Sequence, residues 1–309
     1  MNTPVLFLIF NRPDTTKKVF EQIRKAQPPK LYVAADGPRK DQPNEEQRCK
    51  QVRQIATNVD WECEIKTLFR NENLGCKYAV SRAIDWFFEN EEMGIILEDD
   101  CFPSESFFRF CEILLKKYRH DSRIMHINGN NYGADETKFS NSNFSYHFGC
   151  MPQVWGWATW SRAWNEYDLE LENYSREELY NMIYWDCFFK KEAYKKRQFE
   201  RWDQVKNNKV DTWDYQWQYA VLSASGFCVV PKKNLVSNIG FGENATHTKD
   251  RYSYKDSIDI DSINLPLEHP SFVIPDKKVN YWYQENMLAS PSILLRIENK
   301  IKSLIELYT

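Results

Sequence analysis

The chain has 309 residues, which is enough to bury a substantial core in one large domain or two small ones. Its 41 lysines and arginines nearly balance its 44 aspartates and glutamates, so the net charge is -3. This balance argues against a nucleic-acid-binding protein, which usually carries a strong basic excess. The eight cysteines show no C-x-x-C spacing, which argues against a zinc ribbon and indicates reduced thiols.

The first half of the chain alternates between predicted strands and helices. Apolar runs predict strands over residues 5–10, 31–35, 64–69 and 93–97. Helical periodicity and capping signals predict helices between them, over residues 14–25, with Asp14 or Thr15 as the cap, 45–58 and 76–90. Strands separated by such helices form right-handed βαβ units, so we expect an α/β fold with a mostly parallel sheet.

The second half of the chain is less regular. We expect helices over residues 104–118, 176–206 and 213–223, the last of them amphipathic, and strands over 123–128 and 228–231. Between them lies an aromatic, glycine-broken segment at 151–164, and a glycine-rich loop follows at 240–247.

Three adjacent carboxylates, Glu98, Asp99 and Asp100, follow the fourth predicted strand. Acids packed this closely repel one another and are costly to desolvate. A hard divalent cation, Mg²⁺ or Mn²⁺, is the simplest partner for them, and such a cation often carries a diphosphate with it. The alternative interpretation is an acidic turn exposed to water.

Polar residues also follow the other three strands of the first half. These are Asn11 and Arg12, Asp36 and Gly37, and the segment 71–75. Ligands of open α/β sheets bind beyond the carboxyl ends of the strands. We therefore expect four polar clusters to converge on one edge of the sheet and to form a ligand site.

This ordered set of segments resembles the GT-A fold glycosyltransferases, which use a nucleotide-diphosphosugar as donor. The similarity covers about residues 3–250 and is greatest to the inverting N-acetylglucosaminyltransferase I type and to related bacterial surface-glycan enzymes. It includes Asn11-Arg12, Asp36, the acidic triplet in place of a D-x-D element, Gly156-Trp157, Trp213-Asp214 and a late loop ending in His247.

The resemblance implies a Rossmann-like GT-A domain over residues 1–250. Its nucleotide-sugar-binding half would be 1–130 and its acceptor-binding half 131–250, followed by a C-terminal extension at 251–309. The implied activity is the metal-dependent, inverting transfer of a hexosyl or N-acetylhexosaminyl group. The donor would be a UDP-sugar, and the acceptor a hydroxyl of a glycan or glycolipid in bacterial surface polysaccharide synthesis.

The same resemblance assigns roles on the donor side. Asp100 would bind the Mn²⁺ or Mg²⁺ ion, Glu98 the sugar hydroxyls and Asp99 the ribose. Asp36 would contact uracil or ribose, although an Asp before Gly can simply form a turn. Arg12 would reach the diphosphate, or alternatively lie on the surface. Asn73, with Gly75, would let the backbone approach the nucleotide, or cap a helix, and His247 would contact phosphate or metal, or be solvated.

An inverting transfer needs a base on the acceptor hydroxyl, and a carboxylate is the usual choice. The resemblance points to Asp214, within Asp211-Thr212-Trp213-Asp214. The second Asp of the family's Trp-Asp-Asp-Trp pattern is absent, so Asp211 and Glu243 remain alternatives. The structural interpretation of Asp211 or Asp214 is a helix N-cap.

Two further features bear on the acceptor. Trp155, Trp157 and Trp160 could form an acceptor platform, although core packing is expected for at least two of them. Residues 291–309 form an apolar stripe with a basic remainder, which predicts an amphipathic helix on a membrane surface, on the body of the protein or on a second subunit. No apolar run approaches the roughly 20 residues of a transmembrane helix, and no leader is evident, so we expect a cytoplasmic protein with possible contact to the inner face of the membrane.

Two other functions are compatible with an acidic site on a parallel sheet. A sugar nucleotidyltransferase would usually carry a glycine-rich, basic loop after the first strand, where this chain has Asn11-Arg12-Pro13-Asp14. A non-catalytic carbohydrate-binding protein would carry a decayed site, and the complete acidic triplet argues against it.

Overall fold

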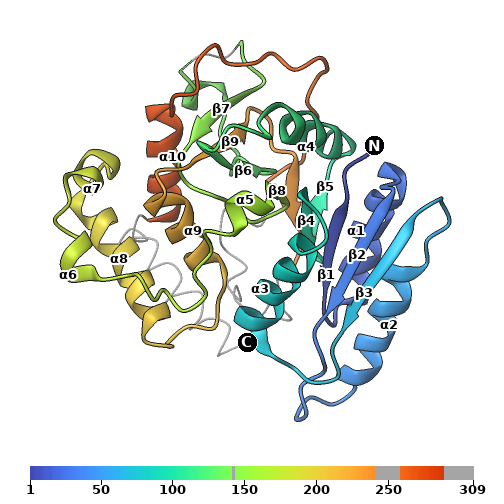
Figure 1. The fold of residues 1–309 in the computed structure, drawn as a ribbon. Coiled ribbons are helices and arrows are strands. Elements are labelled where there is room, and N and C mark those ends of the chain that lie inside the picture. Colours follow the sequence, from blue (N-terminus) through green and yellow to red (C-terminus); the bar gives the residue numbers. More distant parts are fainter. Residues whose placement is uncertain (141–142, 241–257, 289–309) are drawn as a thin grey trace, which may run out of the picture.

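The computed structural model describes residues 1–140, 143–240 and 258–288. The described residues form an eight-stranded sheet in the order β3-β2-β1-β4-β8-β6-β9-β7 (Figure 1). Its strands are β1 (Val5–Ile9), β2 (Lys30–Ala35), β3 (Glu64–Phe69), β4 (Met93–Glu98), β6 (Ile124–Asn128), β7 (Tyr146–Gly149), β8 (Trp157–Trp160) and β9 (Phe227–Pro231). A small antiparallel pair joins β5 (Cys101–Pro103) to β10 (Val236–Asn238).

The strand directions confirm the predicted mostly parallel sheet. β1 pairs in parallel with both β2 and β4, and β2 with β3. β8 lies antiparallel between β4 and β6, so β6 and its parallel neighbour β9 run in the same direction as the first four strands. Only β7 and β8 oppose that direction within the described sheet.

Helices cover both faces of the sheet. One face packs against α1 (Pro13–Ala26), α2 (Glu45–Thr57) and α4 (Glu105–Lys117) through a continuous apolar core. The other face packs against α3 (Gly75–Phe88), α5 (Ser161–Trp164) and α9 (Asp214–Ser223) through a second core rich in tryptophan. The result is a three-layer α/β structure whose strands are buried on both sides, as their apolar runs predicted.

A third apolar cluster lies to one side of the sheet (Figure 1). It contains residues of α6 (Arg176–Leu179), α7 (Ile183–Phe188), α8 (Glu192–Lys206) and α10 (Lys277–Met287), and a short 3-10 turn at Glu136–Lys138 lies nearby. The helix α9 contributes to this cluster with one side and to the tryptophan-rich core with the other. α9 is therefore buried over most of its length, and the predicted amphipathic character is wrong.

The predicted helix over residues 176–206 is also wrong in its continuity, because the chain breaks it into three. One break lies between α7 and α8, where the backbone N–H of Lys190 donates to Gln284 Oε1 at 2.8 Å. A contact to α10 thus replaces the helical hydrogen bond. A smaller correction concerns α1, which begins at Pro13 with Arg12 as its N-cap residue rather than Asp14 or Thr15.

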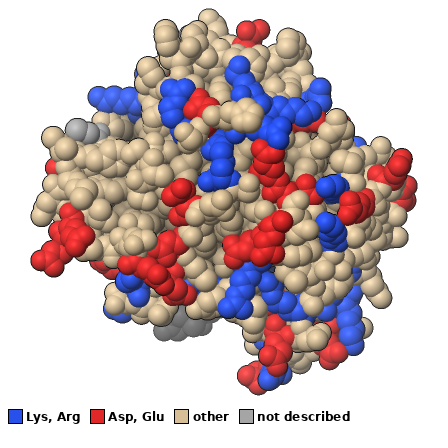
Figure 2. All heavy atoms as spheres, in the orientation of Figure 1, with Lys and Arg blue, Asp and Glu red and all other residues tan. Residues whose placement is uncertain are grey.

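The surface charge, the cysteines and the helix lengths bear on localisation and partners. On the face shown in Figure 2, a group of lysines and arginines lies near the top, and basic and acidic side chains are interspersed elsewhere. The seven cysteines whose side chains the structure describes are all free thiols. None of the described helices combines the length and apolar character needed to cross a bilayer. The predicted helix at 291–309 lies outside the described residues.

Candidate active site

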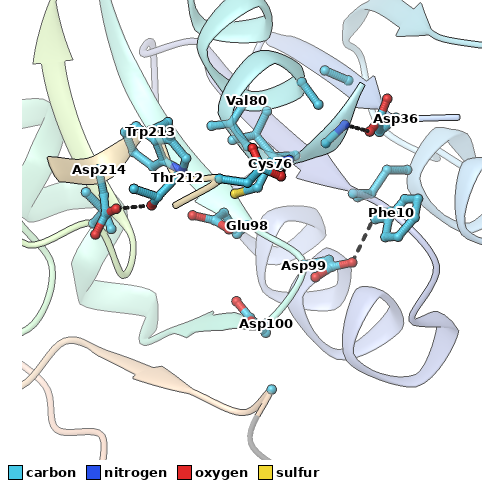
Figure 3. A pocket seen from close by; sticks show the side chains of 18 of the residues that line it. Phe10, Asp36, Cys76, Val80, Glu98, Asp99, Asp100, Thr212, Trp213 and Asp214 are labelled. Carbon is cyan, nitrogen blue, oxygen red and sulfur yellow. Dashed lines mark hydrogen bonds between the residues drawn. The ribbon is translucent and has the colours of Figure 1, made fainter. Parts of the chain in front are cut away.

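A cavity of about 600 Å³ opens at the carboxyl ends of β1, β2 and β4. The predicted clusters meet there, because Arg12, Asp36, Asn73 and the acidic triplet all line it. Figure 3 shows Asp36 and Asp214 on opposite sides of the triplet. The expected convergence on one sheet edge is confirmed, and it includes a wall from the second half of the chain.

The acidic triplet begins at the last residue of β4. Ile95, Ile96 and Leu97 are fully buried between the two helical layers, so the chain leaves the core at Glu98. Asp99 accepts a hydrogen bond from the backbone N–H of Phe10 at 3.2 Å, and this contact joins the ends of β4 and β1. Asp99 is buried, and its hydrogen bond to Phe10 fixes the end of β4 beside the end of β1.

Arg12 forms ion pairs with two of the three acids. Its Nη2 donates to Asp99 Oδ1, and its Nη1 donates to Asp100 Oδ2 at 2.9 Å. Burial opposes the charge of Arg12, but the two carboxylates outweigh burial and raise its pKa above the ordinary value. In this structure the guanidinium is thus engaged by the acids, and its predicted contact with a diphosphate stays a prediction.

Glu98 differs from its two neighbours because its carboxylate forms no hydrogen bond or ion pair with any described residue. Burial, followed by the negative charges of Asp100 and Asp99, raises the pKa of Glu98 to about 8. Burial likewise raises the pKa of Asp99 to about 6, although Arg12 opposes the shift. One guanidinium is therefore too little positive charge to balance three adjacent carboxylates, of which Asp99 is buried and the other two are half-buried.

The Asp36 carboxylate organises the loop before α3. It accepts hydrogen bonds from the backbone N–H of Leu74 at 3.0 Å and of Gly75 at 3.2 Å, and from Asn73 Nδ2 at 2.9 Å. The backbone N–H of Gly37 also donates to it at 2.9 Å. Burial is the largest cause acting on this group and raises the pKa of Asp36. Asp36 and Asn73 thus hold each other at the cavity wall, and their predicted nucleotide contacts remain predictions.

Two arginines of the cavity wall were not predicted from the sequence. Arg70 directly follows β3, and its Nη1 donates to the carbonyl of Ala79 at 3.2 Å. Arg39 lies over the ring of Phe10, 5.4 Å from its centroid, and is held by the fully buried Glu45. The signal was available, because both residues follow predicted strand ends in the same way as Arg12.

The two candidate bases near the start of α9 have different surroundings. The carboxylate of Asp211 accepts hydrogen bonds from the backbone N–H of Cys76 at 3.0 Å and of Lys77 at 2.8 Å, so it caps the first turn of α3. Asp214 is the first residue of α9 and accepts a hydrogen bond from Thr212 Oγ1. Asp214 is half-buried and borders the cavity. The geometry therefore favours Asp214 over Asp211, while Glu243 and His247 lie outside the described residues.

A cysteine also borders the cavity at the start of α3. A thiol at a helix N-terminus is often ionised, but burial, together with Glu98 and Asp214, raises the pKa of Cys76 above its ordinary value. The thiol is thus protonated, and a nucleophilic role is disfavoured.

The wall as a whole carries an excess of negative charge. Its carboxylates are Asp36, Glu98, Asp99, Asp100, Asp211 and Asp214, and its guanidinium groups are Arg12, Arg39 and Arg70. Across the residues that the structure describes, no group of three or more His, Cys, Asp or Glu side chains is arranged to hold a metal ion. The donor chemistry still fits a hard cation. Among the described residues Glu98 has no partner, and Cys101 Sγ, at 3.5 Å, is the one hydrogen-bond donor to Asp100 Oδ1.

The three tryptophans considered for an acceptor platform divide by burial, and one histidine is buried beside them. Trp157 and Trp160 are core residues, whereas Trp155 is half-buried and lines the cavity. His126 is fully buried, and burial lowers its pKa to about 3. It accepts a hydrogen bond from Trp217 Nε1 at 3.0 Å, so its role is structural.

The chain matches no protein-family model and no curated protein. The structure of apo UDP-glucose pyrophosphorylase is similar over 75% of this chain and 90% of its own, with 8% identity and a TM-score of 0.38. HddC from Yersinia pseudotuberculosis is similar over 53% of this chain and 80% of its own, with 9% identity and a TM-score of 0.32. Similarity at these TM-scores supports no inference about the activity of this chain.

Proposed function

We propose that this chain is a glycosyltransferase that moves a sugar from a nucleotide-diphosphosugar, with UDP as the nucleotide, to a hydroxyl acceptor. The observation that carries the proposal is the acidic triplet at the end of β4, inside a cavity whose opposite wall supplies Asp214. The resemblance to GT-A enzymes was drawn from these same segments. A glycan or glycolipid of the bacterial surface is the acceptor that the resemblance suggests.

The donor would lie between the two walls of the cavity. Mn²⁺ or Mg²⁺ held by the Asp100 carboxylate would neutralise the negative charge of the departing diphosphate. Arg12, freed from Asp100, would hold a phosphate oxygen, and Arg70 lies at the same edge of the sheet. Glu98, which lines the cavity beside Asp100, would orient the hydroxyls of the transferred sugar.

The transfer itself would be a single displacement with inversion at the anomeric carbon. The acceptor oxygen forms a bond to that carbon as the bond from carbon to the diphosphate oxygen breaks. Asp214 takes the proton of the acceptor hydroxyl, and the nucleoside diphosphate leaves with the electron pair. Asp214 suits this role because its side chain faces the cavity and is not used to cap α3.

The connection between β1 and α1 bears on the nucleotidyltransferase alternative. It consists only of Phe10, Asn11 and Arg12, since β1 ends at Ile9 and α1 begins at Pro13. Arg12 is paired with acids, and Asn11 Nδ2 donates to the buried Glu45 at 2.7 Å. A short connection tied down in this way favours a glycosyltransferase over an enzyme that needs a glycine-rich triphosphate loop.

Thermal unfolding with nucleotide sugars tests the proposal. A ligand that binds the native state raises its apparent stability. UDP-sugars should raise the unfolding temperature only when Mn²⁺ or Mg²⁺ is present, whereas ADP-glucose serves as a control. Release of pyrophosphate from UTP and a sugar 1-phosphate, without UDP release from any UDP-sugar, would instead establish the nucleotidyltransferase.

Location is a separate part of the proposal. We infer a cytoplasmic enzyme that contacts the inner face of the membrane through residues 291–309, whose apolar and basic residues alternate with helical spacing. Removing residues 289–309 should then abolish flotation of the protein with anionic vesicles.

A further inference from the structure

Two half-buried aromatic side chains border the cavity together with Asp214. Trp155 comes from the segment before β8, and Tyr215 follows Asp214 in the first turn of α9. The cavity also has an amide nearby, from Asn238 at the end of β10. Only one of the three predicted platform tryptophans thus reaches the cavity, and a tyrosine joins it there.

Trp155 is held in place by the chain on its C-terminal side. Gly156 has a φ of 61°, and a Cβ added to it would lie 2.8 Å from Val236 Cγ2. Its carbonyl accepts a hydrogen bond from the backbone N–H of Gly129 at 2.8 Å. This turn, which only glycine fits, separates the half-exposed Trp155 from the fully buried Trp157.

The ring of Trp155 is also supported from behind. Its centroid lies 5.0 Å from that of Tyr132, and Tyr132 in turn packs edge-on against the fully buried Tyr283 at 5.8 Å. An aromatic series therefore runs from the core of the second half to the cavity wall. Such support makes Trp155 a rigid apolar surface, which loses little conformational entropy when a ligand binds.

Tyr215 is supported from the opposite side by α8. Trp202 Nε1 donates to the carbonyl of Tyr215 at 3.2 Å, and the guanidinium of Arg201 lies 5.1 Å from the ring centroid. The two aromatic residues thus come from separately packed elements and border one cavity beside Asp214. Arg201 is the guanidinium that accompanies this wall, and its Nη2 donates to the carbonyl of Met287 at 2.8 Å. The wall at the ends of β1, β2 and β4, here called the donor wall, is instead lined by Arg12, Arg39 and Arg70.

We propose that Trp155 and Tyr215 form the acceptor subsite and that it binds a sugar ring, so the acceptor is a saccharide recognised through its ring. This inference rests on the proposed function and deepens it. A pyranose ring has an apolar C–H face that packs on an aromatic ring, and its hydroxyls match the Asp214 carboxylate and the Asn238 amide.

Saturation-transfer NMR on the full chain tests the inference. The probes are methyl β-glucoside, methyl β-galactoside, the methyl glycoside of N-acetylglucosamine, and hexyl β-glucoside, each with and without UDP and Mn²⁺. We expect saturation of ring protons for at least one probe. Trp155→Leu should weaken its affinity about three- to tenfold, while Trp155→Phe retains most of it. Phe272→Ala, an exposed aromatic residue that does not line the cavity, is the matched control and should change nothing.

Three outcomes would overturn the saccharide subsite: no saturation of any ring proton, saturation of the hexyl chain alone, or an unchanged affinity in the folded Trp155→Leu variant. Retained UDP binding in these cases would leave the proposed function standing. If UDP and Mn²⁺ fail to bind but Trp155-dependent saturation persists, the subsite is supported and the glycosyltransferase proposal fails.

Discussion

The two walls of the cavity are built in different ways. On the donor wall, charged groups at strand ends are fixed by backbone N–H groups and by one another, as Asp99 is by Phe10 and Arg12. On the opposite wall, Trp155 and Tyr215 come from segments supported by packed aromatic rings. The parallel sheet therefore positions the charged side chains of the cavity, and the aromatic cluster beside the sheet positions its apolar surface. The comparison predicts that substitutions on the donor wall change nucleotide and metal binding, while those on the opposite wall change transfer and acceptor use.

The largest effect is expected from substitution of Asp214 on the opposite wall. Asp214→Asn should lower the rate of sugar transfer by about 10²- to 10⁴-fold, because the amide cannot accept the proton of the acceptor hydroxyl. UDP binding, measured by calorimetry, should stay the same. Asp211→Asn is the matched control, since Asp211 caps α3. We expect it to cost about 0.5–2 kcal/mol of unfolding free energy and to leave most of the transfer rate. Normal turnover by Asp214→Asn would assign the base elsewhere.

Asp100 provides the corresponding test of the donor wall. Asp100→Ala should weaken Mn²⁺-dependent binding of UDP by on the order of 10²-fold, because the carboxylate expected to hold the cation is lost. Calorimetric titration of UDP with and without Mn²⁺ measures the effect. Equal affinity in the variant and the wild type would remove the metal role from Asp100. Binding of methyl glycosides should be unaffected, since they meet the other wall.

Asp36 should affect stability as well as nucleotide binding. Asp36→Asn places an amide where the backbone N–H groups of Leu74 and Gly75 donate, so at least one hydrogen bond is lost. We expect a loss of about 2 kcal/mol in unfolding free energy, measured by urea denaturation. UDP affinity should fall too, because the hydrogen bond from Asn73 Nδ2 to residue 36 is weakened and only its hydrogen bond to the Gly37 carbonyl is kept in full. A fully stable variant would show that the loop before α3 is held by other contacts.

The smallest effect expected is a gain in stability at Glu98. Its pKa is raised to about 8 in the folded protein from the ordinary 4.5, so the folded state keeps a proton that the unfolded state releases between these values. Stability of the wild type should therefore fall as pH rises through this window. Glu98→Gln should remove part of this dependence and stabilise the protein by on the order of 1 kcal/mol at about pH 8.

Urea denaturation at about pH 5 and about pH 8 measures this difference. If the unfolding free energy of the wild type and of Glu98→Gln depended on pH in the same way, the raised pKa would not belong to Glu98. Mn²⁺ sharpens the test, because a bound cation favours the ionised carboxylates, and its binding at about pH 7 should release protons in a weakly buffered titration.

The fold of the first half was predictable because its strands are apolar runs that alternate with helices, and this alternation indicates a parallel sheet. The second half was less so. β8 pairs with β4 through Ala158 and Ile95, and β10 pairs with β5 through Asn238 and Cys101. Such pairings leave no local signal. The same holds for α10 and for the break before α8, where Gln284 captures the backbone of Lys190.

The candidate site, like the fold, was predictable from the sequence only in part. The convergence of Arg12, Asp36, Asn73 and the triplet could be predicted, because parallel strands end at one edge. The partners of each side chain could not, since they depend on contacts between distant residues. Asp211 caps a helix 135 residues earlier in the chain, and only this contact distinguishes it from Asp214. Trp155 likewise could be separated from Trp157 and Trp160 only by burial.

The ion pair between Arg12 and Asp100 would couple the proposed cation and the proposed nucleotide, even if these two ligands do not touch each other. The guanidinium occupies the carboxylate oxygen that a cation would take, and the carboxylate occupies the guanidinium that a phosphate would take. Binding of either ligand requires the Arg12–Asp100 ion pair to break. Once the first ligand has bound, the second therefore binds without the free-energy cost of breaking it. By the reciprocity of linked equilibria, metal should raise the affinity for nucleotide by the same factor as nucleotide raises the affinity for metal. The resting protein would then hold neither ligand tightly by itself, and would assemble its charged centre only when both are present.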